Sequence, residues 1–437
     1  MSAVAAAIHG VPARGWNPGS SHRGHRVVSS SRAPIAVAEE SVVTSARTIE
    51  PASALLDALG AGERVECGVN ASGVRGLFAA RSLRRGEPVL EIPLREYGLT
   101  DDPGETRMSW SRQLGRKLVH LRRDALDDAS SLSGAMRNYA GSLPKMGEPA
   151  PGLANDPACV AALAGAWDCT EAVAAMIKFA GQVTDSYAEE RTLDPTLALE
   201  EWRWAMRAVH SRTFRVEDER GVRPTRRALI AAADLLNHTS VSDEVNCEWV
   251  ADDTYFVVSA TRDVPKNGEL LFKYGDQSDA HFALFHGFVP STNPHNRVLL
   301  FPNATNALDW YQTVVANVPF GAPGWDTEKE RVRETTRKTF GTYKVDARTG
   351  LRHRVIEDLY LREDGVASGS ARMLFEEMCG DEAYASEVIA RRAKELRREM
   401  EESTPAVDAA LAALSQHSRE LVRRYRQRKM DILSRVE

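Results

Sequence analysis

Cysteine is scarce in this 437-residue chain, and no two cysteines are spaced as a metal site or a local disulfide would require. The five cysteines stand far apart and form no Cys-x-x-Cys pair, at positions 67, 159, 169, 247 and 379. This spacing argues against a disulfide framework and against a cysteine-rich zinc site. Long apolar runs are also missing, since no stretch of about eighteen apolar residues offers a membrane span. We therefore expect neither a metal centre nor a membrane partner.

The chain also has little excess charge. Its formal net charge is −5, with 43% hydrophobic and 27% charged residues. This balance is typical of a soluble globular protein and disfavours general nucleic-acid binding. A chain of this length has room for two or three domains and a substantial core.

Acidic residues are absent before Glu39. The same tract carries four arginines and a run of serines, namely Arg14, Arg23, Arg26, Arg32, Ser20, Ser21, Ser29, Ser30 and Ser31. A basic, hydroxyl-rich and acid-free N-terminus is typical of an organelle transit peptide. We therefore expect residues 1–44 to be a disordered targeting segment, for the chloroplast first and the mitochondrion second. A disordered tail without a targeting role is the alternative.

Short β-strands are predicted from about residue 60. The segments Val65–Val69, Gly76–Ala79 and Pro88–Pro93 are bounded by turn residues, and two later segments, Val245–Val250 and Tyr255–Val258, flank a polar turn. Between these groups the apolar spacing is helical, for example at Leu114, Leu118 and Leu121.

The sequence becomes helical again after Asn296. Three segments carry apolar residues at three- and four-residue spacings, namely Arg354 to Arg362, Ala371 to Met378 and Ala383 to Arg435. A terminal basic run follows, formed by Arg423, Arg424, Arg426, Arg428 and Lys429. Such a run is typical of a solvated helix face, with a binding patch as the alternative.

Three short motifs carry the functional signal. The run Asp234-Leu235-Leu236-Asn237-His238 is followed by Tyr274-Gly275, and a turn Gly73-Val74-Arg75-Gly76 lies far upstream. Singly, each is explained by an ordinary hairpin turn, helix cap or strand end. In this order, and with Gly287-Phe288 and Asn293-Pro294 behind them, they resemble the SET-domain methyltransferases. The intervening helical stretch resembles the Rubisco large-subunit methyltransferase-like group of that family.

The resemblance implies an α+β fold. We expect a SET-domain β-fold with a pseudoknot over residues 60–296, split by a helical insertion at about 98–205. A C-terminal all-helical domain over residues 297–437 would hold the substrate protein.

The resemblance also implies the site. Tyr274 would be the catalytic tyrosine, and S-adenosylmethionine would be the methyl donor. Donor-binding residues would be Gly73, Val74, Arg75, Arg212, Asn237, His238 and Phe288. Phe214, Asp234 and His286 would lie towards the acceptor.

Two residues depart from the family pattern. His286 stands where relatives often have a tyrosine, so the number of methyl groups added does not follow from the resemblance. Arg75 stands where relatives usually have a larger apolar residue, and we therefore expect Arg75 to meet the donor through its main chain.

The resemblance implies a donor-dependent protein-lysine N-methyltransferase that is a monomer. Its substrate would be a chloroplast protein, such as the Rubisco large subunit, aldolase or another stromal protein. A related actin-directed branch methylates histidine; it has a polar residue at the Phe214 position and a tryptophan at the Ala233 position, so Phe214 and Ala233 favour lysine. A protein-histidine methyltransferase and a catalytically silent SET scaffold in an organellar complex remain the alternatives.

Overall fold

The computed structural model describes most of the chain from residue 50 onward. The described ranges are 50–105, 107–148, 152–163, 170–216, 225–317, 343–345, 352–354 and 359–436. Residues 42–437 belong to one compact unit. The predicted targeting segment, residues 1–44, lies outside the described residues.

An antiparallel hairpin carries the first motif. It consists of β1 (Val65–Val69) and β2 (Arg75–Ala79), as the sequence predicts. Asn70 closes its turn, because the Asn70 Oδ1 accepts from the backbone amide of Val74 at 3.0 Å. Gly73 has a φ of +77°, a backbone conformation that glycine adopts without steric cost.

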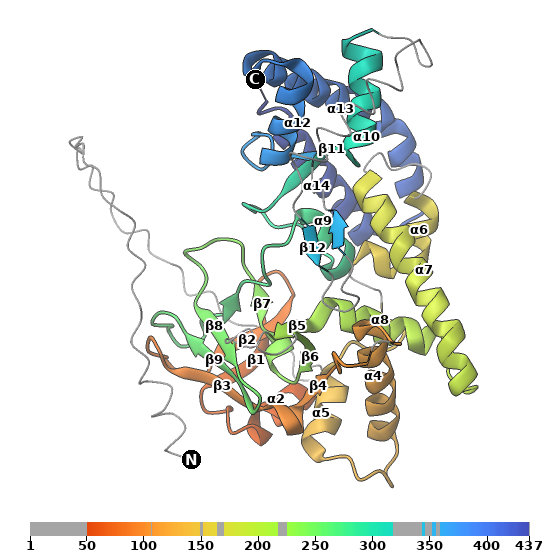
Figure 1. The fold of residues 1–437 in the computed structure, drawn as a ribbon. Helices are drawn as coiled ribbons and strands as arrows, with labels where there is room; N and C mark the ends of the chain where they lie inside the picture. The colour runs from red at the N-terminus through yellow and green to blue at the C-terminus, as the bar shows by residue number, and fades with distance from the viewer. Residues whose placement is uncertain are drawn as a thin grey trace, which may run out of the picture. The chain divides into compact units, whose positions relative to one another are not determined.

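Two three-stranded antiparallel sheets form most of the remaining β-structure (Figure 1). Their strand orders are β3-β9-β8 and β4-β6-β5. The strands are β3 (Pro88–Pro93), β4 (Gly98–Thr100), β5 (Thr213–Val216), β6 (Arg226–Ile230), β8 (Cys247–Ala251) and β9 (Tyr255–Ala260). In β9 every second side chain is buried, which is the period of a strand with one face on the core. The strands predicted at the places of β3, β8 and β9 are confirmed.

A short parallel pair joins two distant segments. Strand β7 (Asn237–His238) pairs in parallel with β10 (Leu271–Phe272). The chain just before β10 also runs along β2, because the Leu270 amide donates to the Leu77 carbonyl at 2.8 Å. The hairpin, the Asn-His segment and the segment leading to Tyr274 therefore meet at one place.

Helices occupy the interval between β4 and β5. They are α4 (Trp110–Leu126), α5 (Gly134–Ser142), η2 (Leu153–Asn155), α6 (Pro157–Leu163), α7 (Thr170–Leu193) and α8 (Leu199–Arg212), after α2 (Glu50–Ala58) and α3 (Leu94–Tyr97) earlier in the chain. Ser109 and Ser133 cap α4 and α5 by accepting backbone amides, as N-cap serines do. Helix α4 packs along α8, with Gly115 against the rings and sulfur of Trp202 and Met206.

The C-terminal region is largely helical and has its own apolar core. After α9 (Asp279–His281) and η4 (Phe282–His286), its elements are β11 (Arg297–Phe301), α10 (Ala304–Trp310), η5 (Tyr311–Val315), β12 (Tyr343–Val345), β13 (Arg352–Arg354), β14 (Leu359–Arg362), α12 (Gly369–Cys379), α13 (Glu382–Leu411) and α14 (Gln416–Leu433). Apolar residues of β11, β14, α10, α12 and α13 pack together. Together with the SET-like β-region, this confirms the predicted α+β class.

Two secondary-structure predictions in this region need correction. The predicted helix from Arg354 to Arg362 is wrong, because β14 pairs with β11 and β13 pairs with β12, both antiparallel. The apolar run of β11 needs a partner strand for its backbone groups, and β14 supplies it. The predicted helix from Ala383 to Arg435 is two helices, since Ser415 caps a new helix by accepting the Ser418 amide.

The terminal basic run is not a simple solvated face. Arg426 and Lys429 are only 7% and 2% exposed. Lys429 donates to the Arg297 carbonyl, and Arg428 pairs with the fully buried Asp279 at 3.3 Å. These contacts tie α14 to β11 and α9. Only the N-terminal part of the run, Arg423 and Arg424, lies exposed.

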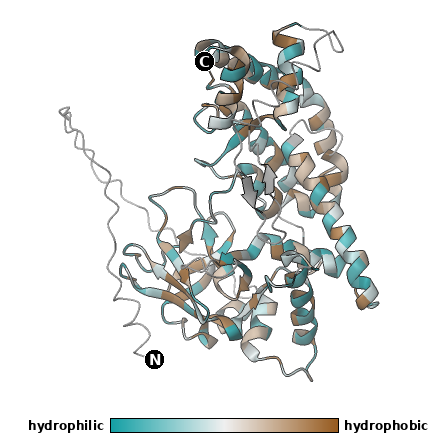
Figure 2. Ribbon diagram, in the orientation of Figure 1, coloured by the Kyte–Doolittle hydropathy of each residue, from teal (hydrophilic) through white to brown (hydrophobic). Residues whose placement is uncertain are grey.

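The helices of the chain are amphipathic. Figure 2 shows polar and apolar residues alternating around them rather than long apolar surfaces. Among the helices that the structure describes, none combines the length and apolar character needed to cross a bilayer.

Gly76 gives a direct test of the meeting point of these segments. A Cβ at Gly76 would lie 2.5 Å from Asn237 Nδ2 and 2.8 Å from Glu269 Oε1. We expect Gly76→Ala to lower the free energy of unfolding by about 1–3 kcal/mol, because the added methyl forces these groups apart. The control is Gly134→Ala at the start of α5, where a Cβ meets nothing within 4 Å. Chemical denaturation that finds both variants equally stable would contradict the assigned crowding.

Candidate active site

The site is built around the crossing of β7 and β10. The Tyr274 amide donates to the His238 Nδ1 at 3.0 Å, so the segment after β10 is bonded to the side chain of β7. The Tyr274 hydroxyl donates to the Leu236 carbonyl at 2.7 Å. The Asn-His segment therefore holds both the main chain and the phenol of the predicted catalytic tyrosine. Burial raises the pKa of Tyr274, so its hydroxyl keeps its proton at neutral pH.

Asn237 ties the hairpin to the same crossing. Its Nδ2 donates to the Arg75 carbonyl at 3.0 Å and to Glu269 Oε1 at 2.8 Å. The Asn70 amide also donates to the Glu269 carboxylate, at 3.3 Å. Glu269 thus joins both asparagines and was not predicted as a site residue, although it ends the Lys-Asn-Gly-Glu run before β10.

Both side chains of the Asn-His pair are therefore occupied within the protein. The remaining ring nitrogen of His238 is 2.8 Å from the Ser240 hydroxyl. Because Nδ1 accepts, the neutral ring carries its proton on Nε2 and donates there. Contacts of this segment with a bound molecule thus fall to its main chain and to the Asn237 side-chain oxygen.

A buried cluster of charges lies beside this crossing. Arg212, the last residue of α8, donates through Nη1 to the Asp234 carbonyl at 3.0 Å and to its carboxylate at 3.3 Å. The Tyr139 hydroxyl of α5 donates to the same carboxylate at 3.2 Å. Burial raises the pKa of Asp234, and the neighbouring Arg212 and Arg75 oppose that rise. Tyr139 was not predicted as a site residue.

Two buried polar atoms in this cluster lack partners. Arg212 Nε and Asp234 Oδ1 have no hydrogen-bond partner among the described residues. Both come from residues that the sequence predicted for the site. Leaving such atoms buried and unpaired is costly, so the cluster is suited to receive a polar ligand.

The chain reaches Asp234 through a strained residue. Ala232 is fully buried and has a φ of +69°, a region that residues other than glycine rarely adopt. This turn leads from β6 into η3 (Ala233–Leu235) and so directs Asp234 at Arg212. Strain of this kind persists only where the surrounding packing demands it.

Aromatic side chains line the acceptor side that the sequence predicts. Phe214 lies 5.0 Å from Phe256 and 5.9 Å from Phe272, measured between ring centroids. Phe272 in turn lies 5.2 Å from the Tyr274 ring. One ring, that of Phe272, thus lies between the Phe214 ring and the Tyr274 ring.

Imidazole rings also lie close to Tyr274. His238 and His286 each lie 5.1 Å from its ring. Phe288, a predicted donor-binding residue, lies 5.9 Å from His238 between ring centroids. Burial lowers the pKa of His238 to about 4 and that of His286 to about 3, so both rings are neutral near pH 7.

Most of the predicted site residues thus converge. Val74 stands apart, because its side chain is 49% exposed at the tip of the hairpin next to Gly73. Gly73 and Val74 could therefore contact a ligand only from this exposed turn. The described residues contain no group of three or more potential metal ligands.

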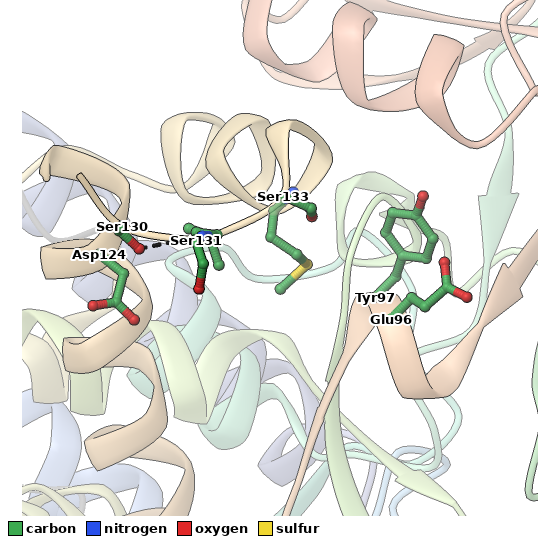
Figure 3. A pocket seen from close by; sticks show the side chains of 8 residues that line it. Glu96, Tyr97, Asp124, Ser130, Ser131 and Ser133 are labelled. Atoms are coloured by element: carbon green, nitrogen blue, oxygen red, sulfur yellow. Dashed lines mark hydrogen bonds between the residues drawn. The ribbon is translucent and has the colours of Figure 1, made fainter. Parts of the chain in front are cut away.

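A separate pocket of about 430 Å³ lies at the start of α5 (Figure 3). In Figure 3, Asp124 and Ser130 lie on one side and Glu96 and Tyr97 on the other. Its lining is completed by Ser131, Leu132, Ser133 and Met136. None of the predicted site residues lines it, so the crossing remains the candidate active site.

Comparison with known proteins agrees with this geometry. The model of the SET domain matches residues 74–275. Residues 74–275 therefore match a SET domain, as the motifs predicted. The fold of the chain is that of the Rubisco large-subunit methyltransferase (LSMT) type: a solved LSMT SET domain bound to lysine and AdoHcy superposes with a TM-score of 0.57 at 14% identity, covering 90% of both chains. Rubisco LSMT bound to AdoMet gives 0.56 at 14% identity, covering 90% of this chain and 91% of that one.

The curated sequence relatives are named for a histidine acceptor. The actin-histidine N-methyltransferase of Canis lupus familiaris is 33% identical over 117 residues, which is 26% of this chain and 19% of that protein. The Mus musculus and Homo sapiens proteins are 32% identical over the same length and shares. The chain thus matches about a fifth of the length of these relatives.

The buried imidazoles predict a pH dependence of stability. Burial lowers the pKa of His210, His238 and His281 to about 4, and that of His286 to about 3. Below about pH 6.5 the unfolded chain protonates these rings while the folded chain does not. The free energy of unfolding should therefore fall as the pH drops from about 6.5 to 4, by up to about 1.4 kcal/mol per pH unit for each ring.

His281→Gln removes one of these groups. Urea denaturation of this variant between pH 4.5 and 6 should show a free energy of unfolding that depends less steeply on pH. The difference in slope from the unmodified chain should correspond to the uptake of up to one proton fewer on unfolding. His120→Gln, which replaces an exposed ring on α4, is the control and should leave the slope unchanged. Equal slopes for both variants and the unmodified chain would rule out a neutral buried His281.

Proposed function

We propose that this protein is an S-adenosylmethionine-dependent protein-lysine N-methyltransferase. The observation that carries the proposal is the crossing of β7 and β10, which holds the protonated Tyr274 hydroxyl beside the buried pair Arg212–Asp234. The match to the SET domain and the fold of the LSMT type support methyl transfer as the reaction.

The residues present fit the donor. When bound, S-adenosylmethionine supplies a methyl group on a sulfonium, and its amino-acid end carries a carboxylate. Arg212 has a buried Nε without a partner among the described residues, which suits it to bind that carboxylate. The Asn237 and His238 main chain and the Phe288 ring would bind the adenosine end, and the exposed Gly73–Val74 turn would cover it. The LSMT structures of the same fold are bound to AdoMet or AdoHcy, which supports this choice of donor.

The acceptor must lose a proton before it can attack. A free lysine amine with a pKa near 10.4 is only about 0.4% neutral at pH 8. The aromatic surroundings of Phe214 and Phe272 disfavour the charged amine by desolvation. The Tyr274 hydroxyl would then orient the neutral amine as a dipole, without adding a competing charge. Enforced alignment of this kind can lower the barrier by roughly 7–11 kcal/mol.

Two alternatives are distinguished by particular residues. The curated relatives that methylate actin histidine favour a histidine acceptor. Against this, Phe214 and Ala233 stand where the histidine-directed branch is expected to carry a polar residue and a tryptophan, and Phe214 packs among aromatic rings. A silent scaffold would not need to retain Arg212, Asn237, His238 and Tyr274 together, and we therefore favour a methyltransferase.

The proposed substrate is a protein of the chloroplast stroma, with the Rubisco large subunit and aldolase as candidates. The fold of the LSMT type supports a plant plastid substrate, and the acid-free segment before Glu39 supports import. The protein is proposed to act as a monomer.

The function is tested with labelled S-adenosylmethionine and a chloroplast extract. The purified protein should transfer the labelled methyl group to one polypeptide, and mass spectrometry should place the group on lysine. Tyr274→Phe should reduce turnover at least a hundredfold while donor affinity holds, because only the hydroxyl dipole is lost. A labelled methyl group on histidine would agree with the proposal of methyl transfer and exclude lysine as the acceptor.

The control for the hydroxyl is Tyr187→Phe. Tyr187 also donates its hydroxyl to a backbone carbonyl, that of Leu197, at 3.3 Å. Both variants therefore lose one hydroxyl–carbonyl bond, but only Tyr274 lies at the crossing. If Tyr187→Phe loses as much turnover as Tyr274→Phe, the effect is on stability and Tyr274 is not the catalytic tyrosine.

The proposed location is tested by fusing residues 1–45 to a fluorescent reporter. The fusion should enter chloroplasts, since the segment combines arginine and serine without acidic residues before Glu39. A reporter in which the four arginines are replaced by glutamine is the control and should remain outside. Cytosolic fluorescence of the unmodified fusion would exclude the chloroplast and leave the enzymatic proposal untouched.

A further inference from the structure

The Arg75 side chain is directed inward from the hairpin. Its main-chain carbonyl is bonded to Asn237, as described above, while its guanidinium donates through Nη2 to the Ser142 carbonyl at the end of α5, at 2.7 Å. The expectation that Arg75 acts through its main chain alone does not account for this direction. A guanidinium has five N–H donors, and the Ser142 carbonyl takes only one bond.

The guanidinium lies near the charge cluster, because Arg75 and the cluster are bonded to the same helix: Arg75 donates to Ser142 of α5, and Tyr139 of α5 donates to Asp234. Burial lowers the pKa of Arg75, Arg212 lowers it further, and Asp234 opposes both. Arg212 pairs with Asp234 and Arg75 is a second guanidinium nearby, so the three side chains together are positive whether or not Asp234 is ionised. The two other groups that act on Arg75 do not offset this charge. Burial raises the pKa of the Cys67 thiol, which keeps it neutral, and Glu148 is exposed to solvent.

A partly buried positive excess favours an anion. Two like charges held close together with reduced access to water are costly unless a negative group joins them. Arg212 Nε is a buried donor without a partner among the described residues, so the cluster has unused donors as well as excess charge. The ligand that satisfies both is small and carries a single negative charge on two oxygens.

We infer that Arg75 and Arg212 together bind the α-carboxylate of the methyl donor, with the Arg75 guanidinium as the second cation of that subsite. This inference rests on the proposed function. Arg75 is then a donor-binding residue through its side chain. The same positive charge disfavours a cationic amine here, and the acceptor therefore approaches from the side of Phe214.

The test compares two ligands that differ in the amino-acid end. S-adenosylhomocysteine has the carboxylate, whereas 5′-methylthioadenosine has the same nucleoside without the amino acid. Calorimetry on the full chain should show that Arg75→Leu weakens S-adenosylhomocysteine at least tenfold and 5′-methylthioadenosine less than twofold. Arg75→Lys, which retains the charge, should recover most of the preference for S-adenosylhomocysteine.

Two further variants separate binding from folding. Arg84→Leu removes an exposed arginine of the same domain and should change neither affinity. Arg75→Gln keeps a donor for the Ser142 carbonyl but drops the charge, and it should show the same selective loss as Arg75→Leu even if the leucine variant folds poorly.

The outcomes are distinct. Equal weakening of both ligands, or no change in either, would overturn the role of Arg75 while leaving donor binding by the unmodified chain intact. If the unmodified chain binds neither ligand, the proposed function fails and the inference fails with it.

Discussion

The structure depends on one short crossing of the chain. Strands β7 and β10 have two residues each, and a parallel pair of that length contributes little by itself. The crossing persists because side chains reinforce it: His238 accepts the Tyr274 amide, and Asn237 bonds both the β1–β2 hairpin and Glu269. Because these bonds are partly buried, each missing partner would leave a costly unpaired polar group. The same residues therefore hold the fold together and position Tyr274, the proposed catalytic tyrosine.

A second constraint comes from the charges beside the crossing. Arg212 arrives from the end of α8, Asp234 from a strained turn and Tyr139 from α5. The helical insertion is thus joined to the β-region through hydrogen bonds to one carboxylate. Arg75 adds a further link, from the hairpin to the end of α5. A donor bound at this cluster would therefore contact a group of side chains that is bonded to both the helical insertion and the strands.

The C-terminal region shows where reasoning from pattern fails. The segment around Leu359 has apolar spacing that fits a helix, yet it forms β14 because β11 requires a partner strand. The basic run in α14 looked solvated, yet Lys429 and Arg428 are bonded to a carbonyl of β11 and a carboxylate of α9. Composition reports the charge of a side chain but not the acceptors that distant segments place beside it.

The sequence by itself determined the fold class, the strands around the hairpin and the order of the motifs, because turn residues and apolar periods are local properties. It also named nearly all the residues that converge at the crossing, through their resemblance to the SET family. Only the tertiary structure decided how those residues are used. It placed the Asn237 and His238 side chains within the protein, added Glu269 and Tyr139, and turned the Arg75 guanidinium inward. These are pairings between segments far apart in the chain, and their partners are set by packing rather than by any local pattern.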